Sequence, residues 1–186
     1  PADVVEEILR IYGYNNVEVP SQVRASLYST PKPEKNKIQN IVSDFLSCNG
    51  FVEIMSNSLT KSDYYKNSDE WEIENCVKIL NPLSAELDVM RQTLLFNGLE
   101  SISYNQNRKN VDLKLFEFGN IYKQENEKFI EENHLSIFLT GRKFPENWNS
   151  SDKEVDFYDL KGIVEEIFNR LGIIKHTSKV GSQKSY

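Results

Sequence analysis

Three carboxylates near the start of the chain are spaced so that they can act together. Asp3, Glu6 and Glu7 stand at positions i, i+3 and i+4 of a segment with helical periodicity, and residues so spaced share one side of a helix. Like charges repel unless a cation lies between them, and Mg²⁺ takes oxygen ligands of this kind. Acidic residues also favour the first turn of a helix because of its dipole. The spacing therefore leaves a Mg²⁺ site and simple helix stabilisation both open.

Two further segments contain residues that could bind a ligand: Arg91 and the predicted helix start near Asp156. Arg91 follows the turn-forming segment 81–84 and is expected just before or within a helix start. An exposed Arg there can hold a phosphate or carboxylate, but we favour a structural salt bridge. Further along, Asp156 or Asp159 can cap a helix. Lys161 either points into a cleft or is solvated, and we favour the solvated side chain.

Common catalytic motifs are missing from the sequence. There is no Ser-His-Asp order, no G-x-x-x-x-G-K and no G-x-G-x-x-G. His134 and His176 have no partner at metal-ligand spacing. Cys48 and Cys76 are too few for a disulfide framework and indicate reduced thiols in a cytoplasmic protein. From residue chemistry alone, we predict no catalytic residue.

Composition indicates a globular domain. The chain has 186 residues, of which 39% are hydrophobic and 27% charged, enough for one domain and a small extra element. A net charge of −6 argues against direct binding to a phosphate backbone. No apolar run approaches the roughly 18 residues of a membrane span. Because the chain starts with Pro1 rather than Met, we expect an internal segment of a longer protein.

Hydrophobic periodicity predicts the elements that must position these residues. The predicted helices are residues 5–12, 38–46, 86–106 and 160–171. The predicted strands are residues 51–59, 76–80, 111–122 and 135–140, with a turn near Gly119-Asn120. Glycines at 13, 50 and 172 end three of the helices. Because helices and strands mix without regular alternation, we predict an α+β fold with an antiparallel sheet.

A proline-containing stretch divides the chain. Pro20, Pro31 and Pro33 stand among polar residues in segment 15–33, which is typical of a linker. We therefore expect residues 1–20 to be the C-terminal helix of a preceding domain and residues 21–30 to be a linker. Residues 31–186 then form the main domain.

Several sequence blocks together resemble the β subunit of bacterial phenylalanyl-tRNA synthetase. They are the acidic helix 3–14, Asn81-Pro82-Leu83-Ser84, Met90-Arg91-Gln92-Thr93-Leu94-Leu95, Leu115-Phe116-Glu117-Phe118-Gly119 and Asp159-Leu160-Lys161-Gly162. Each block is weak alone, but their order and spacing make the match specific. The match covers essentially the whole chain and fades after Gly181, so we expect the last strands of the domain to be missing.

The resemblance implies a class II synthetase core, an antiparallel sheet flanked by helices, with a non-catalytic scaffold role. The enzyme would be a cytoplasmic (αβ)₂ heterotetramer that attaches phenylalanine to tRNA(Phe). Its α subunit would use ATP to activate phenylalanine, and other domains would bind the tRNA. The resemblance also implies that Asp3, Glu6 and Glu7 bind Mg²⁺ near the α subunit, with a further Asp ligand upstream of Pro1.

The resemblance also implies a subunit interface on the helix after the linker. Its apolar stripe consists of Ile38, Ile41, Val42, Phe45 and Leu46, and part of it would pack in a helix bundle with the α subunit. Without that partner, an exposed apolar patch should lead to self-association as a two-fold dimer. The alternative is a monomer in which all five residues face inward.

The sequence departs from a catalytic class II core. Such a core holds ATP phosphate with a strand-borne Arg in a Phe-Arg-x-Glu setting, whereas the comparable strand here, residues 115–119, has no Arg. The Gly-rich, Arg-ending ATP motif is also missing. Two alternatives to the scaffold remain: a catalytic class II core that itself activates an amino acid, and a stand-alone interaction module of the same fold.

Overall fold

The chain divides into two compact units, residues 1–32 and 33–186. The computed structural model describes residues 2–18, 34–66, 68, 70–84, 86–144, 148–149 and 153–179. The predicted linker, residues 21–30, lies outside the described residues.

The first unit contains a short amphipathic helix. α1 spans Ala2–Tyr12, and the 3-10 helix η1 spans Tyr14–Asn16. Gly13 ends α1 as predicted: its φ of 88° is unfavourable for any residue with a Cβ atom. The Gly13 amide donates a hydrogen bond to the Leu9 carbonyl at 2.8 Å. α1 itself buries no residue.

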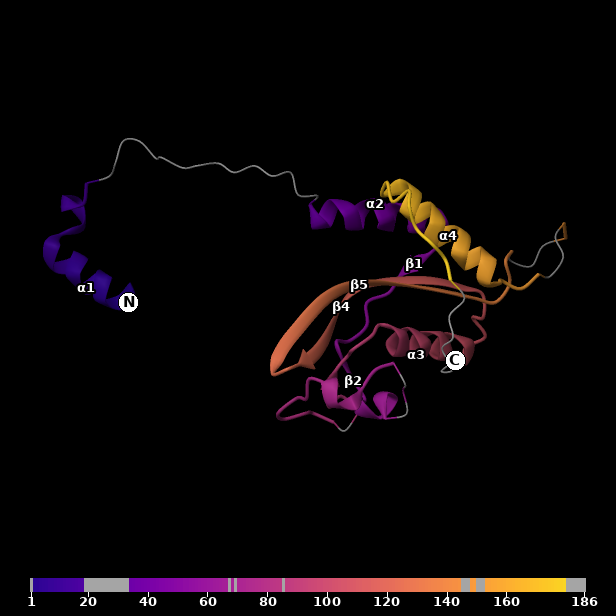
Figure 1. The fold of residues 1–186 in the computed structure, drawn as a ribbon, viewed down its shortest axis with the longest axis horizontal. Helices are drawn as coiled ribbons and strands as arrows, with labels where there is room; N and C mark the ends of the chain where they lie inside the picture. The colour runs from indigo at the N-terminus through magenta and orange to yellow at the C-terminus, as the bar shows by residue number, and fades with distance from the viewer. Residues whose placement is uncertain are drawn as a thin grey trace. The chain divides into compact units, whose positions relative to one another are not determined.

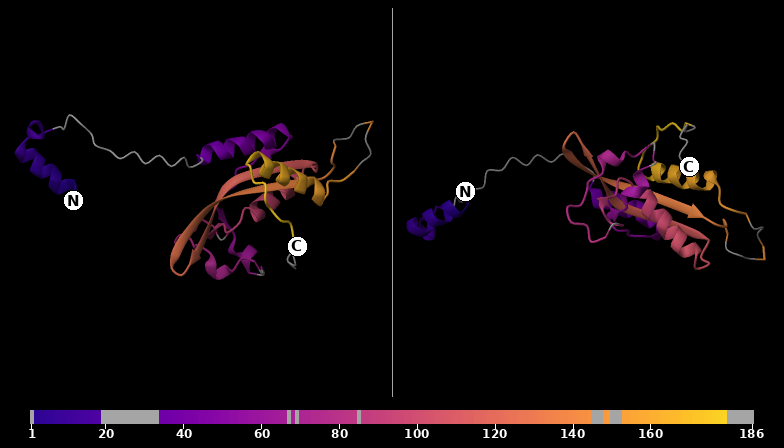
Figure 2. Two further views of the ribbon diagram at one scale, coloured as in Figure 1. Left: turned by 45° about the horizontal axis from the view of Figure 1, so that its top comes forward. Right: turned by 90° about the horizontal axis from the view of Figure 1, so that it is seen from below.

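The second unit is built around a long β-hairpin covered on both faces (Figure 1). Its elements are α2 (Lys35–Cys48), β1 (Val52–Glu53), β2 (Leu59–Thr60), η2 (Ser62–Tyr65), η3 (Ile73–Asn75), β3 (Val89–Met90), α3 (Leu95–Gln106), β4 (Leu113–Glu125), β5 (Lys128–Thr140) and α4 (Phe157–Arg170). α2 and α4 lie over one face of the β4–β5 hairpin, and α3 with the β2–β3 pair lies on the other. Figure 2 shows the hairpin bending away from α2 and α4 toward its turn.

Two small sheets organise this unit. In the three-stranded sheet β4 lies between β1 and β5. β4 and β5 pair antiparallel from Leu113↔Thr140 to Glu125↔Lys128, whereas β1 pairs parallel to β4. The predicted antiparallel pairing is present in β4 and β5, and β1 adds one parallel pair to the sheet. β2 and β3 form a separate antiparallel pair.

The hairpin is longer than the sequence pattern predicted. Its turn lies at Asn126 and Glu127, both with positive φ, as a two-residue hairpin turn requires. The predicted turn at Gly119-Asn120 is wrong, because both residues lie inside β4. Residues 128–133 are mostly polar or charged, yet they pair with β4 as part of β5. Charged side chains are tolerated there because this part of the hairpin is exposed to solvent.

Long-range pairing overrides helical periodicity before α3. The predicted helix 86–106 is wrong in its first part, since Val89 and Met90 pair with Thr60 and Leu59. Only residues 95–106 are helical. The predicted strand 51–59 is likewise interrupted, because Ser56 uses its backbone N–H to bind the Glu117 carboxylate. The predicted strand 76–80 is reduced to an isolated bridge from Lys78 to Val89.

The ends of α2 and α4 follow the predicted local signals. Gly50 has φ of 82° after α2, and Gly172 has φ of 74° after α4, both in the left-handed region that suits glycine. α4 begins with Asp156 as its cap.

None of the helices described here has the length and apolar character to cross a membrane.

Apolar residues form two core clusters, one on each side of the hairpin. The larger unites Val42, Phe45 and Leu46 of α2 with Phe116 of β4 and Ile167 of α4. The smaller contains Tyr65, Cys76 and Val89. Because strand side chains alternate between faces, β4 serves as a wall shared by both layers.

Two helical glycines allow a matched test of this packing. A Cβ atom at Gly98 would lie 2.0 Å from the Cζ atom of Phe138, whereas a Cβ atom at Gly162 would meet nothing within 4 Å. Gly98→Ala should lower the free energy of unfolding by about 1–3 kcal/mol through overpacking. Gly162→Ala should raise it by about 1 kcal/mol through helix propensity. Urea denaturation followed by circular dichroism measures both changes, and a shift of the same sign in both variants would contradict the α3 packing.

Candidate functional site

Arg91 and Glu117 form a buried ion pair in the second unit. The Nη1 and Oε1 atoms are 2.8 Å apart, and the two side chains are only 3% and 1% exposed. The structural salt bridge predicted for Arg91 is confirmed. Arg91 directly follows β3 and precedes the first residue of α3, Leu95, as one of the two predicted positions has it; the helix begins later than predicted because β3 replaces its first part.

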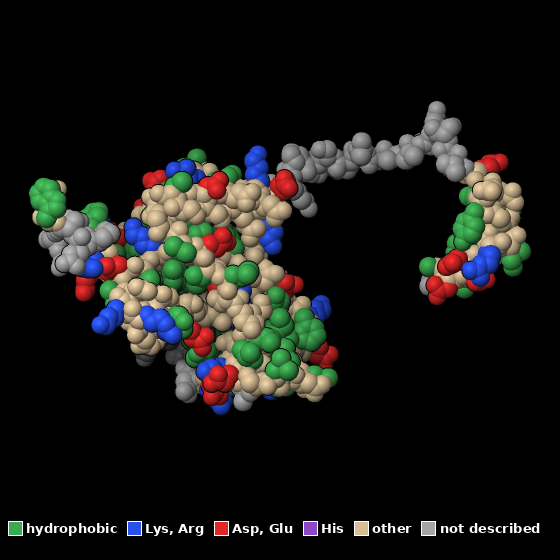
Figure 3. All heavy atoms as spheres, turned by 180° about the vertical axis from the view of Figure 1, so that it is seen from behind, with side chains coloured by type: hydrophobic (Ala, Val, Ile, Leu, Met, Phe, Trp, Pro, Cys, Tyr) green, Lys and Arg blue, Asp and Glu red, His purple; other side chains and the backbone are tan. Residues whose placement is uncertain are grey.

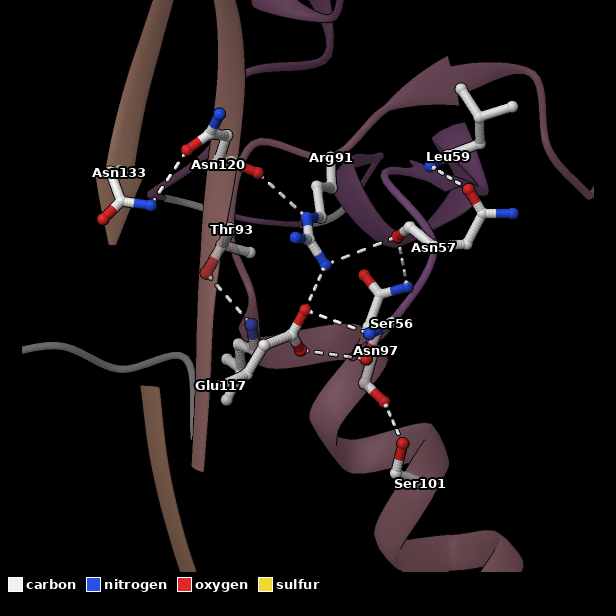
Figure 4. A network of polar contacts seen from close by, with 11 residues as sticks. Ser56, Asn57, Leu59, Arg91, Thr93, Asn97, Ser101, Glu117, Asn120 and Asn133 are labelled. Carbon is white, nitrogen blue, oxygen red and sulfur yellow. Dashed lines mark hydrogen bonds and ion pairs between the residues drawn. The ribbon is translucent and has the colours of Figure 1, made fainter. Parts of the chain in front are cut away.

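Groups from three segments surround the pair (Figure 4). The Glu117 carboxylate accepts hydrogen bonds from the Ser56 hydroxyl at 2.9 Å and the Ser56 N–H at 3.1 Å. Arg91 Nε donates to the Asn120 carbonyl at 3.0 Å, and Nη1 donates to the Asn57 carbonyl at 3.4 Å. The pair thus ties the segment between β1 and β2, the end of β3, and β4 to one another.

Gly119 makes room for the guanidinium. A Cβ atom at this position would lie 2.2 Å from Arg91 Nη2 and 2.8 Å from Leu94 Cδ2. A glycine inside a strand often marks such a close approach. The requirement for glycine here comes from Arg91 rather than from a turn.

Gln92, the residue after Arg91, is the centre of a second polar cluster. Its backbone N–H donates to the Tyr65 hydroxyl at 2.9 Å, and its side-chain Nε2 donates to the Glu72 carbonyl at 2.8 Å. Burial raises the pKa of Tyr65 to about 12 and also raises the pKa of the Cys76 thiol. Both groups stay protonated at neutral pH, so Cys76 is not an activated nucleophile.

Lys123 is a basic residue on β4 that the sequence pattern did not indicate. Because β4 continues to Glu125, the strand includes Tyr122-Lys123-Gln124-Glu125, an aromatic residue, a basic residue and a Glu at Phe-Arg-x-Glu spacing. The misplaced turn hid this tetrapeptide, although strand-forming residues on both sides could have indicated it. The Lys123 ammonium lies 3.0 Å from the Glu125 carboxylate, and this hydrogen bond raises the pKa of Lys123.

The carboxylates predicted to bind Mg²⁺ lie on α1. Asp3, Glu6 and Glu7 are all exposed, and Glu7 accepts a hydrogen bond from Arg10 at 3.0 Å. Within the described ranges, no three Asp, Glu, His or Cys side chains come together as possible metal ligands. These carboxylates do not form a ligand set by themselves. Mg²⁺ binding stays a prediction that requires oxygen ligands from outside α1.

The predicted interface stripe on α2 is divided between core and surface. Val42, Phe45 and Leu46 are buried against the sheet and α4, so they are not available to another subunit. Ile41 is 39% exposed and Ile38 is half-buried. Of the five predicted interface residues, only these two are accessible, because the hairpin under α2 covers the rest of the stripe. The subunit interface itself stays a prediction.

The candidate residues at the start of α4 have structural roles. Asp156 accepts hydrogen bonds from two amides of the first turn, and the Asp159 carboxylate accepts one from the Asp156 N–H, which confirms the predicted capping. Asp159 also pairs with Lys143, whose hydrogen bond lowers the pKa of Asp159. Lys161 lies 3.5 Å from Glu165 one turn further on, in an ion pair at the surface.

Two solved structures share the fold of this chain. One is the ATP phosphoribosyltransferase regulatory subunit/histidyl-tRNA synthetase from Bacillus halodurans C, with a TM-score of 0.56, 13% identity, and coverage of 80% of this chain and 39% of that chain. The other is pyrrolysyl-tRNA synthetase from Desulfitobacterium hafniense, with a TM-score of 0.55, 14% identity, and coverage of 75% and 48%. The predicted α+β, class II aminoacyl-tRNA synthetase-like fold is confirmed. Likeness at this identity shows the fold alone.

Sequence relatives narrow this class to one family. The family model for the phenylalanyl tRNA synthetase beta chain CLM domain matches residues 19–186. The phenylalanine–tRNA ligase beta subunit of Bacteroides fragilis is 48% identical over 97% of this chain, and that of Porphyromonas gingivalis is 41% identical over 92%. The chain belongs to the phenylalanyl-tRNA synthetase beta chain family. It spans 23% and 22% of the length of these relatives.

The buried ion pair should dominate the stability of this unit. Glu117→Ala should lower the free energy of unfolding by about 3–5 kcal/mol, because it leaves the Arg91 charge buried without its partner. Glu86→Ala, which removes the exposed partner of Lys61, is the matched control and should change it by less than about 1 kcal/mol. Urea denaturation compares the two variants. Equal, small losses would mean that the Arg91–Glu117 pair is not the main link between the sheets.

Proposed function

We propose that this chain is a non-catalytic scaffold domain of the β subunit of phenylalanine–tRNA ligase. In this proposal the enzyme is a cytoplasmic (αβ)₂ heterotetramer that attaches phenylalanine to tRNA(Phe). Its α subunit activates phenylalanine with ATP, and domains outside this chain contact the tRNA. Membership of the beta chain family and the names of the relatives support the assignment.

Strand β4 carries the non-catalytic part of the proposal. Phosphate binding in a catalytic class II core requires an Arg with its planar pair of donors, whereas Lys123 offers a single point charge that is already paired with Glu125. On the same strand Glu117 is occupied by Arg91. The two cations, Lys123 and Arg91, are therefore both paired with carboxylates of the protein itself. This pairing favours a structural role over ATP binding.

The buried network suits a scaffold for mechanical reasons. Arg91 and Glu117 are fixed by groups on three segments, and these buried polar contacts favour one arrangement of the layers. A domain that positions partner subunits needs this rigidity more than it needs an accessible cation. The exposed side of α2 at Ile38 and Ile41 is then the surface offered to the α subunit.

Mg²⁺ has a limited place in this proposal. Asp3, Glu6 and Glu7 contribute negative charge to a Mg²⁺ site near the α subunit, but ligands outside α1 must complete it. Mg²⁺ usually keeps several waters and takes one or two carboxylates from a protein, which fits a partial contribution from α1.

Catalysis provides the direct test of the scaffold role. The purified chain should show no phenylalanine-dependent exchange between ATP and pyrophosphate, and Lys123→Arg should not create it. Adding the α subunit and the rest of the β subunit should produce exchange, which serves as the positive control. Phenylalanine-dependent exchange by the chain alone would instead support a catalytic class II core.

Self-association tests the proposed surface of α2. Without the α subunit, the chain should form a dimer at high concentration through the exposed side near Ile41. Ile41→Asp should give a folded monomer, whereas Asn40→Asp, also at an exposed position of α2, should remain dimeric. Light scattering measures the mass, and circular dichroism checks the fold. A monomeric wild-type chain, or an Ile41→Asp variant that only unfolds, would contradict this interface.

A further inference from the structure

Two adjoining cavities lie at the end of the sheet where β4 begins and β5 ends. Their volumes are about 340 Å³ and about 170 Å³. Lys114 and Lys143 line both of them, so the cavities share a wall. The larger one reaches the lower end of the roughly 300–1,000 Å³ typical of small-molecule sites. The space is suited to a small ligand.

Apolar side chains form much of the lining. Those of the larger cavity are Val52, Leu113 and Leu115, and those of the smaller one are Phe51, Leu139, Val155 and Ile163. Burying an apolar ligand against such surfaces contributes about 25 cal/mol per Å² removed from water. The body of a suitable ligand is therefore apolar.

The charged groups of the lining are not balanced. Arg142 pairs with the Asp112 carboxylate, with Nη2 and Oδ2 2.7 Å apart, and Lys143 pairs with Asp159. Lys114 has no carboxylate partner among the described residues, and its ammonium lies 5.9 Å from the centre of the Phe51 ring. Among the described residues of the lining, three cations face two carboxylates, an excess of one positive charge, although the whole chain has a net charge of −6.

Lys and Arg side chains alternate with Asp and Glu side chains at the left of Figure 3. A cation beside apolar walls attracts an anion more strongly than one in open water, because the local dielectric constant is lower.

We propose that the two cavities bind a small organic anion with an apolar body, one carboxylate and no cationic group. The carboxylate binds the Lys114 ammonium, and the body lies against the apolar side chains of the lining. An α-amino acid is disfavoured, because its ammonium group would be repelled by the excess positive charge. This site is separate from the Arg91–Glu117 pair and does not depend on the proposed scaffold function.

Three related probes test the chemistry of the site on the unmodified chain. They are 3-phenylpropionate, the neutral 3-phenylpropanamide and L-phenylalanine, titrated into the isotopically labelled chain of residues 1–186 and followed by amide NMR. 3-Phenylpropionate should give saturable shifts at Val52 and residues 113–115. The amide and phenylalanine should bind about tenfold more weakly, the value of one charge-assisted hydrogen bond.

Substitution of Lys114 identifies the cation. Lys114→Met should weaken 3-phenylpropionate binding about tenfold, whereas Lys128→Met, at the far end of the hairpin, should leave it unchanged. Lys114→Gln serves as a second variant if Lys114→Met does not fold. Shifts that fail to saturate by about 10 mM, equal binding of the neutral amide, or unchanged binding in a folded Lys114 variant would each overturn the proposal.

Discussion

Moving the Arg91 guanidinium and the Glu117 carboxylate out of water is unfavourable unless each group is paired and hydrogen-bonded. The two groups are paired with each other, and Ser56 and two backbone carbonyls supply further hydrogen bonds. These partners come from segments far apart in the sequence. The pair can therefore form only when β3, β4 and the segment between β1 and β2 occupy their final positions, and it selects that arrangement against others of similar compactness.

Backbone bonds at Arg91 extend the effect of the pair. The Arg91 N–H donates to the Ser58 carbonyl at 2.9 Å, and the Arg91 carbonyl accepts from the Tyr122 N–H at 2.8 Å. Residue 91 is thus held between the β2–β3 sheet and β4, the strand against which both layers pack. Gly98 complements this on the same side, since the absence of a Cβ atom lets α3 approach Phe138 closely. The position of the α3 layer rests on a buried charge and a missing side chain together.

The sequence was sufficient where the determining interactions are local. The ends of α2 and α4 depend on Gly50, Gly172 and Asp156, which act on the neighbouring turn, so periodicity and capping predicted them. The local pattern predicts a helix at Val89 because its strand partner, Thr60, is distant in sequence. It predicts a turn at Gly119 because the need for glycine there comes from Arg91, which no local pattern reveals.

At the candidate site, too, the sequence indicates the kind of interaction but not the partner residue. A salt bridge was predicted for Arg91, but its partner was not, because pairing with Glu117 depends on the position of β4. A catalytic cation must leave donors free for its ligand, whereas this guanidinium donates to Glu117, Asn57 and the Asn120 carbonyl within the fold. Releasing it to bind an anion would leave Glu117 buried and unpaired, at a cost of several kcal/mol. The interaction that holds the layers together thus works against phosphate binding by the same Arg, which is the physical basis of the proposed scaffold role.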